Sequence, residues 1–229
     1  MTSVPSTTLD FLRDLAQNNT RDWFHSQKKR YEPVKAAHEA LIADLIGRIG
    51  AFENLANVEP KDCAYRIARD VRFTTDKSPY KTWLAASISE GGRKAARMDY
   101  YLHIQPGGES FIGGGMYAPT SEQLAKFRQE IDYNVAELRR IIEDPTFVRW
   151  FATGEGVRLK TTPKGYPKDH PDIDLLRLTQ LFFLHRFRDE EVVAPDFSAR
   201  VTEACGVLKP YLDFLNFIFF EERDAENTI

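Results

Sequence analysis

Cysteine is scarce in this chain, with only Cys63 and Cys205 among 229 residues. The two lie far apart in the sequence and form no Cys-x-x-Cys pair. Such usage suits the reducing cytosol and not a domain stabilised by a disulfide framework. Both cysteines are predicted to be small, buried side chains.

Long apolar runs are also lacking. The densest ones, residues 181–184 and 217–220, are far too short to span a bilayer. The N-terminal residues show no basic stretch followed by an apolar core, so no signal peptide is expected. Internal repeats, low-complexity tracts and long linkers are absent from the sequence as well. We therefore expect a cytoplasmic protein with no membrane partner.

A strong net charge is missing too, since the formal charge is -3. Nothing global indicates binding to nucleic acid or to an anionic membrane. The charge is unevenly placed, however, because residues 61–81 hold six basic side chains against three acidic ones. A local basic patch on an acidic protein favours a small-ligand site over a duplex-binding surface. The six basic residues are Lys61, Arg66, Arg69, Arg72, Lys77 and Lys81.

Helical periodicity dominates residues 8–50. Thr8 is expected to cap a first helix and Thr20 a second, and Pro33 is expected in the first turn of a third. Gly50 is the predicted end of that third helix. Its apolar positions recur at helical spacing and predict a core-facing stripe of Val34, Leu41, Ile42, Leu45, Ile46 and Ile49.

The middle of the chain changes to strand and turn signals. Short apolar runs at 84–90, 100–105 and 109–113 predict strands, and the Pro-Gly-Gly sequence at 106–108 predicts a hairpin. Residues 65–71 and 181–186 are further strand candidates.

Helices are expected again after residue 120. Thr120 and Gln123 form a capping-box pattern for a helix that breaks near Asn134 and resumes over 135–142. Residues 153–174 read as a loop rich in Gly, Pro, Lys and Asp, and 197–220 as a long helix kinked or divided by Pro210.

This order of elements predicts an α+β fold in which a central, mainly antiparallel sheet is flanked by helices. We expect one domain over residues 1–229. It would comprise an N-terminal helical part (8–50), a strand-rich middle (64–117) and a region of helices with the long loop (120–229).

The segment Tyr65–Lys81 combines three arginines and two lysines with several apolar and aromatic side chains. Guanidinium groups beside apolar side chains need a partner anion. The segment is therefore either an internal salt-bridge lattice or the wall of an anion site. Ile67, Val71 and Phe73 are expected to be buried, and Asp70 to bond an arginine of the segment or backbone N–H groups. If that pair is buried, replacing Asp70 should destabilise the fold.

The same segment resembles the signature of an uncharacterised family of bacterial proteins of about this length, also found inside longer fungal proteins and catalogued as a domain of unknown function. The matching pattern is Arg66-x-x-Arg69-Asp70-x-Arg72-Phe73-x-x-Asp76-Lys77-x-x-Tyr80. The resemblance implies family membership over nearly the whole chain and no activity. Further familiar fragments are Asn19-x-Arg21-x-Trp23-Phe24, Gly113-Gly114-Gly115-x-Tyr117-x-Pro119, Pro163-Lys164-Gly165-Tyr166 and Leu175-Leu176-Arg177.

Three other features of the sequence bear on binding. The run Gly113-Gly114-Gly115 lies between an expected strand and an expected helix and could receive a phosphate, although a plain tight turn or bulge is favoured. The loop lysines Lys160 and Lys164 could fold over the arginine segment, and Arg177 could approach it as well, although a solvated surface loop is favoured. If the loop packs back across the sheet, at least one of the two lysines is expected to face the segment. His170 has no second histidine at ligand spacing, so no metal site is predicted.

The leading hypothesis is an arginine-lined pocket for a small phosphate- or carboxylate-bearing ligand. Nucleic acid is the alternative partner, which would need Tyr65, Phe73 and Tyr80 exposed for stacking. A partner-binding protein with a purely structural motif is the third reading. Catalytic residues, cofactors, enzymatic activity and oligomeric state are left open. The candidate ligand-binding residues are Arg66, Arg69, Asp70, Arg72, Lys77, Tyr80, Lys160, Lys164 and Arg177.

Overall fold

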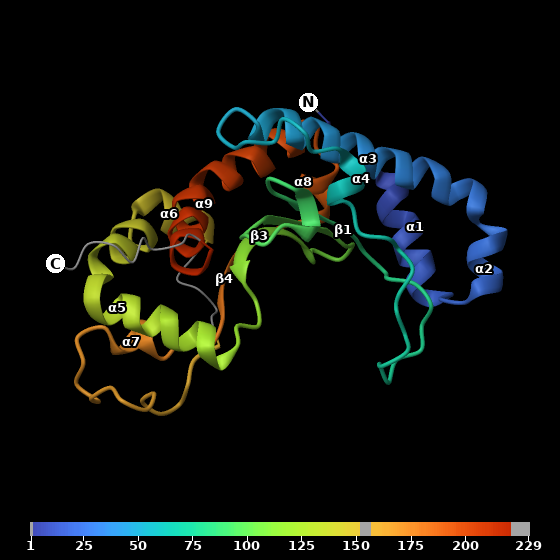
Figure 1. Ribbon diagram of the computed structural model, residues 1–229. Coiled ribbons are helices and arrows are strands. Elements are labelled where there is room, and N and C mark those ends of the chain that lie inside the picture. Colours follow the sequence, from blue (N-terminus) through green and yellow to red (C-terminus); the bar gives the residue numbers. More distant parts are fainter. Residues whose placement is uncertain (1, 152–156, 221–229) are drawn as a thin grey trace. The chain divides into compact units, whose positions relative to one another are not determined.

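The computed structural model describes residues 2–151 and 157–220. They fall into two compact units. Unit 1 comprises Met1–Ala95, Asp99–Gly113 and His185–Gly206, and unit 2 comprises Ala96–Met98, Gly114–Leu184 and Val207–Ile229. Figure 1 shows the order of the elements along the chain. That the units form a single domain stays a prediction.

The sheet confirms the predicted fold class. It has four strands in the order β1-β2-β3-β4, namely Leu84–Ile88, Tyr100–Ile104, Ser110–Met116 and Leu181–Phe187. Strands β1 and β2 are antiparallel, and Leu84 pairs with Ile104. Alternate residues of β2 are buried, so that Tyr100, Leu102 and Ile104 face the core while the residues between them are half-buried.

Helices of unit 1 pack beside this sheet. They are α1 (Ser6–Gln17), α2 (Arg21–Ser26), α3 (Lys28–Ile49), α4 (Pro60–Cys63), the 3-10 turn η1 (Gly92–Lys94) and α8 (Asp189–Val192). Both α3 and α4 contact β1. The stripe predicted on α3 is confirmed for Val34, Leu41, Ile42, Leu45 and Ile49, which are all buried.

Helix boundaries confirm some of the predicted caps and correct others. The Thr20 side chain accepts a hydrogen bond from the Trp23 N–H, and Gly50 is the C-cap of α3. Thr8 does not cap α1, because that helix begins at Ser6 and Thr8 is buried inside it. Pro33 lies beyond the first turn of α3, which begins at Lys28.

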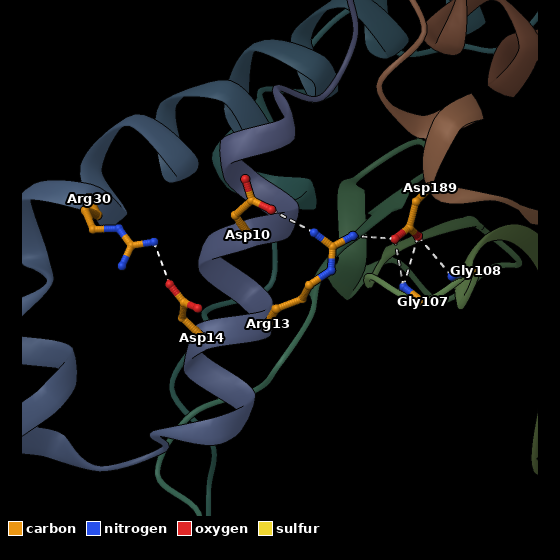
Figure 2. Close-up of polar contacts among 7 residues, drawn as sticks. All are labelled: Asp10, Arg13, Asp14, Arg30, Gly107, Gly108 and Asp189. Carbon is orange, nitrogen blue, oxygen red and sulfur yellow. Dashed lines mark hydrogen bonds and ion pairs between the residues drawn. The ribbon is translucent and has the colours of Figure 1, made fainter.

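The β2–β3 hairpin is the predicted one, and a carboxylate fixes its turn. Gly107 and Gly108 adopt positive φ angles of 89° and 74°, which suit glycine. Both N–H groups donate to the Asp189 carboxylate, at 2.9–3.0 Å. Arg13 on α1 donates to Asp189 and to Asp10 (Figure 2). A single charged network thus ties the hairpin turn to α1 within unit 1.

Helices α5 (Ser121–Ile142), α6 (Pro145–Phe151) and α7 (Ile173–Leu176) belong to unit 2. The Thr120–Gln123 capping box is present, and Asn134 interrupts α5 with non-helical angles, as predicted. Sequence reasoning missed α6. The Asp144 carboxylate accepts hydrogen bonds from the N–H groups of Thr146 and Phe147 at its start.

Two expected elements differ from the structure. Helix α9 (Phe197–Phe219) runs through Pro210 as one element and is not divided there. Residues 65–71 form no strand; only isolated bridges pair Ala64 with Ala86 and Ala68 with Tyr80. None of the helices in the described part of the chain has the length and apolar composition needed to span a bilayer.

Candidate anion-binding site

The arginine segment forms a narrow arm within unit 1, in which two antiparallel chain segments without regular strand structure lie side by side. The Arg69 N–H donates to the Pro79 carbonyl, and the Lys81 N–H to the Ile67 carbonyl, at 2.9 and 2.8 Å. At the base of the arm, the Tyr65 N–H donates to the Ala85 carbonyl of β1 at 2.9 Å. The arm is therefore attached to the edge of the sheet, and residues 70–78 make its tip.

Tyr80 holds this arm to the α1–α2 turn. Its backbone carbonyl accepts from the Asn19 amide at 2.9 Å, and its N–H donates to the Asn19 Oδ1 at 3.1 Å. Its ring stacks on Phe24, with 4.0 Å between the ring centroids. Two of the sequence fragments that carried the family resemblance supply these residues, namely Asn19, Phe24 and Tyr80. Their contacts hold the arm against the α1–α2 turn.

Asp70 and Arg72 form a bidentate pair at the tip, which confirms the predicted bonding of Asp70. Arg72 donates from Nε to Oδ1 at 3.0 Å and from Nη2 to Oδ2 at 2.7 Å. These bonds are the largest cause that lowers the pKa of Asp70. Both side chains are exposed, however. An exposed pair adds little to stability, so the large effect expected for a buried pair does not apply.

Burial of the apolar residues in the segment was predicted correctly only in part. Ile67 is buried, Val71 is half-buried, and Phe73 is 92% exposed. Phe73 lies in the turn at the tip, with the Arg72 guanidinium 5.6 Å from its ring centroid. The prediction for Phe73 is wrong because it rested on residue type, whereas the tip extends beyond the paired part of the arm.

A smaller hollow lies on one side of the arm. Its volume is about 330 Å³, and its lining includes Arg21, Arg69, Lys77 and Tyr80. Two of the three cations there are already engaged, since Arg69 pairs with Asp76 and the Lys77 ammonium donates to the Val71 carbonyl at 2.9 Å. Hydrogen bonds from Ser78 and Arg69 lower the pKa of Asp76.

A larger pocket of about 640 Å³ lies between α3, α4 and the base of the arm. We call it the Arg66 pocket. Five basic side chains line it against a single carboxylate, that of Glu39. The basic residues are Lys35, Lys61, Arg66, Lys81 and Arg93.

Three of these cations have no carboxylate partner among the described residues, and one of them, Arg93, donates instead to the Lys61 and Asp62 carbonyls, at 2.6 and 2.8 Å. Within the described residues, neither the Arg66 guanidinium nor the Lys81 ammonium forms an ion pair. Lys81 Nζ lies 5.1 Å from the centroid of the Tyr65 ring. Burial lowers the pKa of Lys81, and the charge of Arg66 lowers it further. Like charges thus converge at a partly desolvated position, which an anion would relieve.

His38 forms part of the same wall and is 6% exposed. Its Nε2 lies 3.2 Å from the Ala85 carbonyl oxygen, which only accepts, so Nε2 carries the proton. Nδ1 is then a buried acceptor with no hydrogen-bond partner in the described part of the chain. Burial lowers the pKa of His38, so the ring adds no positive charge to the pocket at neutral pH.

The predicted site residues therefore separate into several groups. Arg66 lines the larger pocket, Arg69, Lys77 and Tyr80 line the smaller one, and Asp70 with Arg72 lines neither. Sequence reasoning missed His38, Lys35, Lys81 and Arg93 as neighbours of Arg66. One signal was available, since a histidine at position 38 interrupts the apolar stripe of α3.

The loop residues of the prediction belong to unit 2, so their approach to the arginine segment stays a prediction. Lys160 and Lys164 are exposed. Arg177 donates to the carbonyls of Leu159 and Lys160, at 2.6 and 2.9 Å, and so fixes its own loop. Residues 152–156 of that loop lie outside the described residues.

The other features weighed from sequence have ordinary structural surroundings. His170 Nε2 lies 3.0 Å from Asp132, and His170 Nδ1 accepts from the Asp172 N–H. Over residues 2–151 and 157–220, no group of three or more His, Cys, Asp and Glu side chains is placed to hold a metal ion. Burial raises the pKa of the Cys63 thiol to about 11, which opposes a role as nucleophile.

The architecture defines an α+β protein with a four-stranded antiparallel sheet and a cation-lined pocket at the edge of that sheet. The family model described as conserved hypothetical protein (DUF2461) matches residues 7–214, and the chain belongs to this family. No curated protein and no solved structure matches the chain. The expected membership of an uncharacterised domain family is thereby confirmed.

Proposed function

We propose that the Arg66 pocket binds a small ligand carrying a phosphate or carboxylate group. The observation that supports this most is that Arg66 and Lys81, two cations without a carboxylate partner among the described residues, line the same pocket, where burial and the charge of Arg66 lower the pKa of Lys81. A bound anion would accept hydrogen bonds from both and offset that cost.

The size of the pocket suits a small metabolite. Its volume of about 640 Å³ falls within the usual range for ligand sites, roughly 300–1,000 Å³. His38 lies on the same wall, but its Nδ1 is buried, so the lining cations are the groups that would select a ligand. Because five cations surround one carboxylate, we place phosphate and phosphate monoesters, which can carry two negative charges, first among the anions.

Calorimetric titration with inorganic phosphate tests the proposal. We expect Arg66→Gln and Lys81→Met each to weaken binding about tenfold, because a hydrogen bond to a charged group is worth about 1.5–3 kcal/mol. Arg72→Gln is the matched control, since Arg72 belongs to the same segment but lies outside the pocket. Its affinity should equal that of the wild type.

Two outcomes would contradict phosphate binding in the Arg66 pocket. Equal losses in Arg66→Gln and Arg72→Gln would indicate a diffuse effect of charge, and no heat with any of the proteins at millimolar phosphate would remove the proposal.

One observation favours nucleic acid as a second candidate. Phe73 is exposed at the tip of the arm beside Arg72, an arrangement that can stack a base. Tyr80 is engaged with Phe24, and Tyr65 is half-buried, so one of the three expected aromatics is freely available. Fluorescence anisotropy with a labelled single-stranded oligonucleotide should show binding that Phe73→Ala abolishes if this candidate is correct.

A further inference from the structure

A third hollow, lined mainly by apolar side chains, lies inside unit 2. It is a cavity of about 120 Å³ between α5, the segment around α7, strand β4 and the part of α9 in this unit. Its walls are mostly aromatic and aliphatic. They comprise Phe127, Leu138, Ile142, Leu175, Leu178, Phe182 and Phe183.

One polar group on this wall has no partner. Tyr211 lines the cavity and is only 2% exposed. Its hydroxyl makes no hydrogen bond to any residue in the described ranges, and burial is the cause that raises its pKa. Buried tyrosine hydroxyls ordinarily find a partner, and leaving one unsatisfied is costly. The hydroxyl is therefore a hydrogen-bonding group available to a molecule in the cavity.

The Tyr211 ring is packed from several sides. Its centroid lies 4.8 Å from that of Phe183 and 6.2 Å from that of Phe147, in edge-to-face contacts. Gly115 closes another side, because a Cβ there would lie 3.2 Å from Tyr211 Cε1 and would collide with the Leu181 carbonyl oxygen. The glycine run considered earlier as a phosphate loop thus lies within β3, and Gly115 makes room for Tyr211.

Charged groups at the lining of this cavity differ in their partners. Arg139 is bound to Asp172, Asp174 and Glu143, at 2.7–2.8 Å, and is satisfied. Arg158 and Gln180 also line the cavity, but Arg158 is exposed and Gln180 is half-buried. The Tyr211 hydroxyl is thus the polar group on a buried side chain of this wall that would orient an occupant.

We propose that this cavity binds a single-ring aromatic molecule whose oxygen atom forms a hydrogen bond with the Tyr211 hydroxyl. The size supports a single ring, because an apolar cavity of roughly 150 Å³ is known to hold benzene. A hydrogen bond with the Tyr211 hydroxyl requires one polar atom on that ring, as in a phenol. This site is independent of the Arg66 pocket, and its test does not depend on phosphate binding.

Fluorine NMR on the full chain tests the proposal with 4-fluorophenol and fluorobenzene as probes. We expect the wild type to bind 4-fluorophenol about fivefold more tightly than fluorobenzene, since a net hydrogen bond contributes at about this level. Tyr211→Phe should bind the two probes equally. Tyr133→Phe, at an exposed tyrosine of α5, is the matched control and should keep the preference.

Stability gives a second readout. Because the Tyr211 hydroxyl forms no hydrogen bond with the described residues, Tyr211→Phe should leave the melting temperature unchanged or raise it. A preference for 4-fluorophenol that persists in Tyr211→Phe would overturn the proposal. So would a lowered melting temperature of that variant, or the absence of binding by either probe.

Discussion

The ammonium group of Lys81 lies over the ring of Tyr65, with 5.1 Å between Nζ and the ring centroid, and Arg66 is the neighbouring cation that disfavours its charge. Tyr65 and Lys81 come from opposite sides of the base of the arm. The arm therefore places two cations on the wall of one pocket, with an aromatic ring as the only stabilising contact of the ammonium that the described residues provide. The proposed anion site depends on this arrangement.

The pKa of Lys81 should respond to its neighbour. Arg66→Gln should raise it, because the repulsion from the guanidinium is removed while burial is retained. Inorganic phosphate should raise the Lys81 pKa in the wild type for the same electrostatic reason. NMR titration of the protein with isotopically methylated lysines measures both shifts. An unchanged or lower Lys81 pKa in Arg66→Gln would contradict the described geometry.

Within the arm, we expect Asn19 to matter more for stability than Asp70. Asn19→Ala removes both hydrogen bonds to the Tyr80 backbone and should lower the free energy of unfolding by about 2 kcal/mol. Asp70→Ala breaks an exposed pair and should leave the free energy of unfolding nearly unchanged. Urea denaturation compares the two. A larger loss for Asp70→Ala than for Asn19→Ala would show that the tip is packed.

His38 should make stability fall on the acid side of neutrality. Its pKa in the folded protein lies below the ordinary value of 6.5, because burial disfavours the charged ring. The unfolded chain therefore takes up a proton first as the pH falls below 6.5, and the stabilisation present above that pH is lost progressively.

His38→Gln, which keeps a donor for the Ala85 carbonyl, should flatten the dependence of the free energy of unfolding on pH between 7.5 and 5.5. His25→Gln, at an exposed histidine of α2, is the control and should leave the dependence as in the wild type. A steeper loss of stability in His38→Gln would contradict the buried, neutral ring.

Gly115 should tolerate no side chain. Its φ of +113° is strained for other residues, and a Cβ would meet the Leu181 carbonyl oxygen. We expect Gly115→Ala to lower the free energy of unfolding by about 3 kcal/mol or more. Gly165→Ala separates the two causes, because Gly165 has a φ of +96° with nothing near its Cβ position. That control should cost only about 1 kcal/mol in thermal or urea unfolding.

The parts of the fold that follow from local chemistry could be predicted from the sequence. Thr20, Thr120 and Asn134 behave as expected, because caps and helix breaks depend on a few adjacent residues. The prediction that Thr8 caps α1 is wrong. The helix begins earlier, at Ser6 after Pro5, and Thr8 lies on its buried face.

The candidate site was predictable only in part. The local excess of basic residues located Arg66, but the segment does not converge on one pocket, since the arm turns Arg66 and Arg69 toward different hollows. His38 and Lys35 come from α3, which is distant in sequence, and their approach to Arg66 depends on tertiary packing. Phe73 was expected to be buried and is exposed, because no other element packs against an apolar residue at the tip of the arm.

The position of a bound anion tests the central claim most directly. Crystals of the full chain grown with molybdate, a phosphate analogue, would locate the metal atom by anomalous scattering. We predict a peak in contact with the Arg66 guanidinium and the Lys81 ammonium. Occupied sites only beside Arg21 and Arg69, or no ordered molybdate within the Arg66 pocket at saturating concentration, would contradict it.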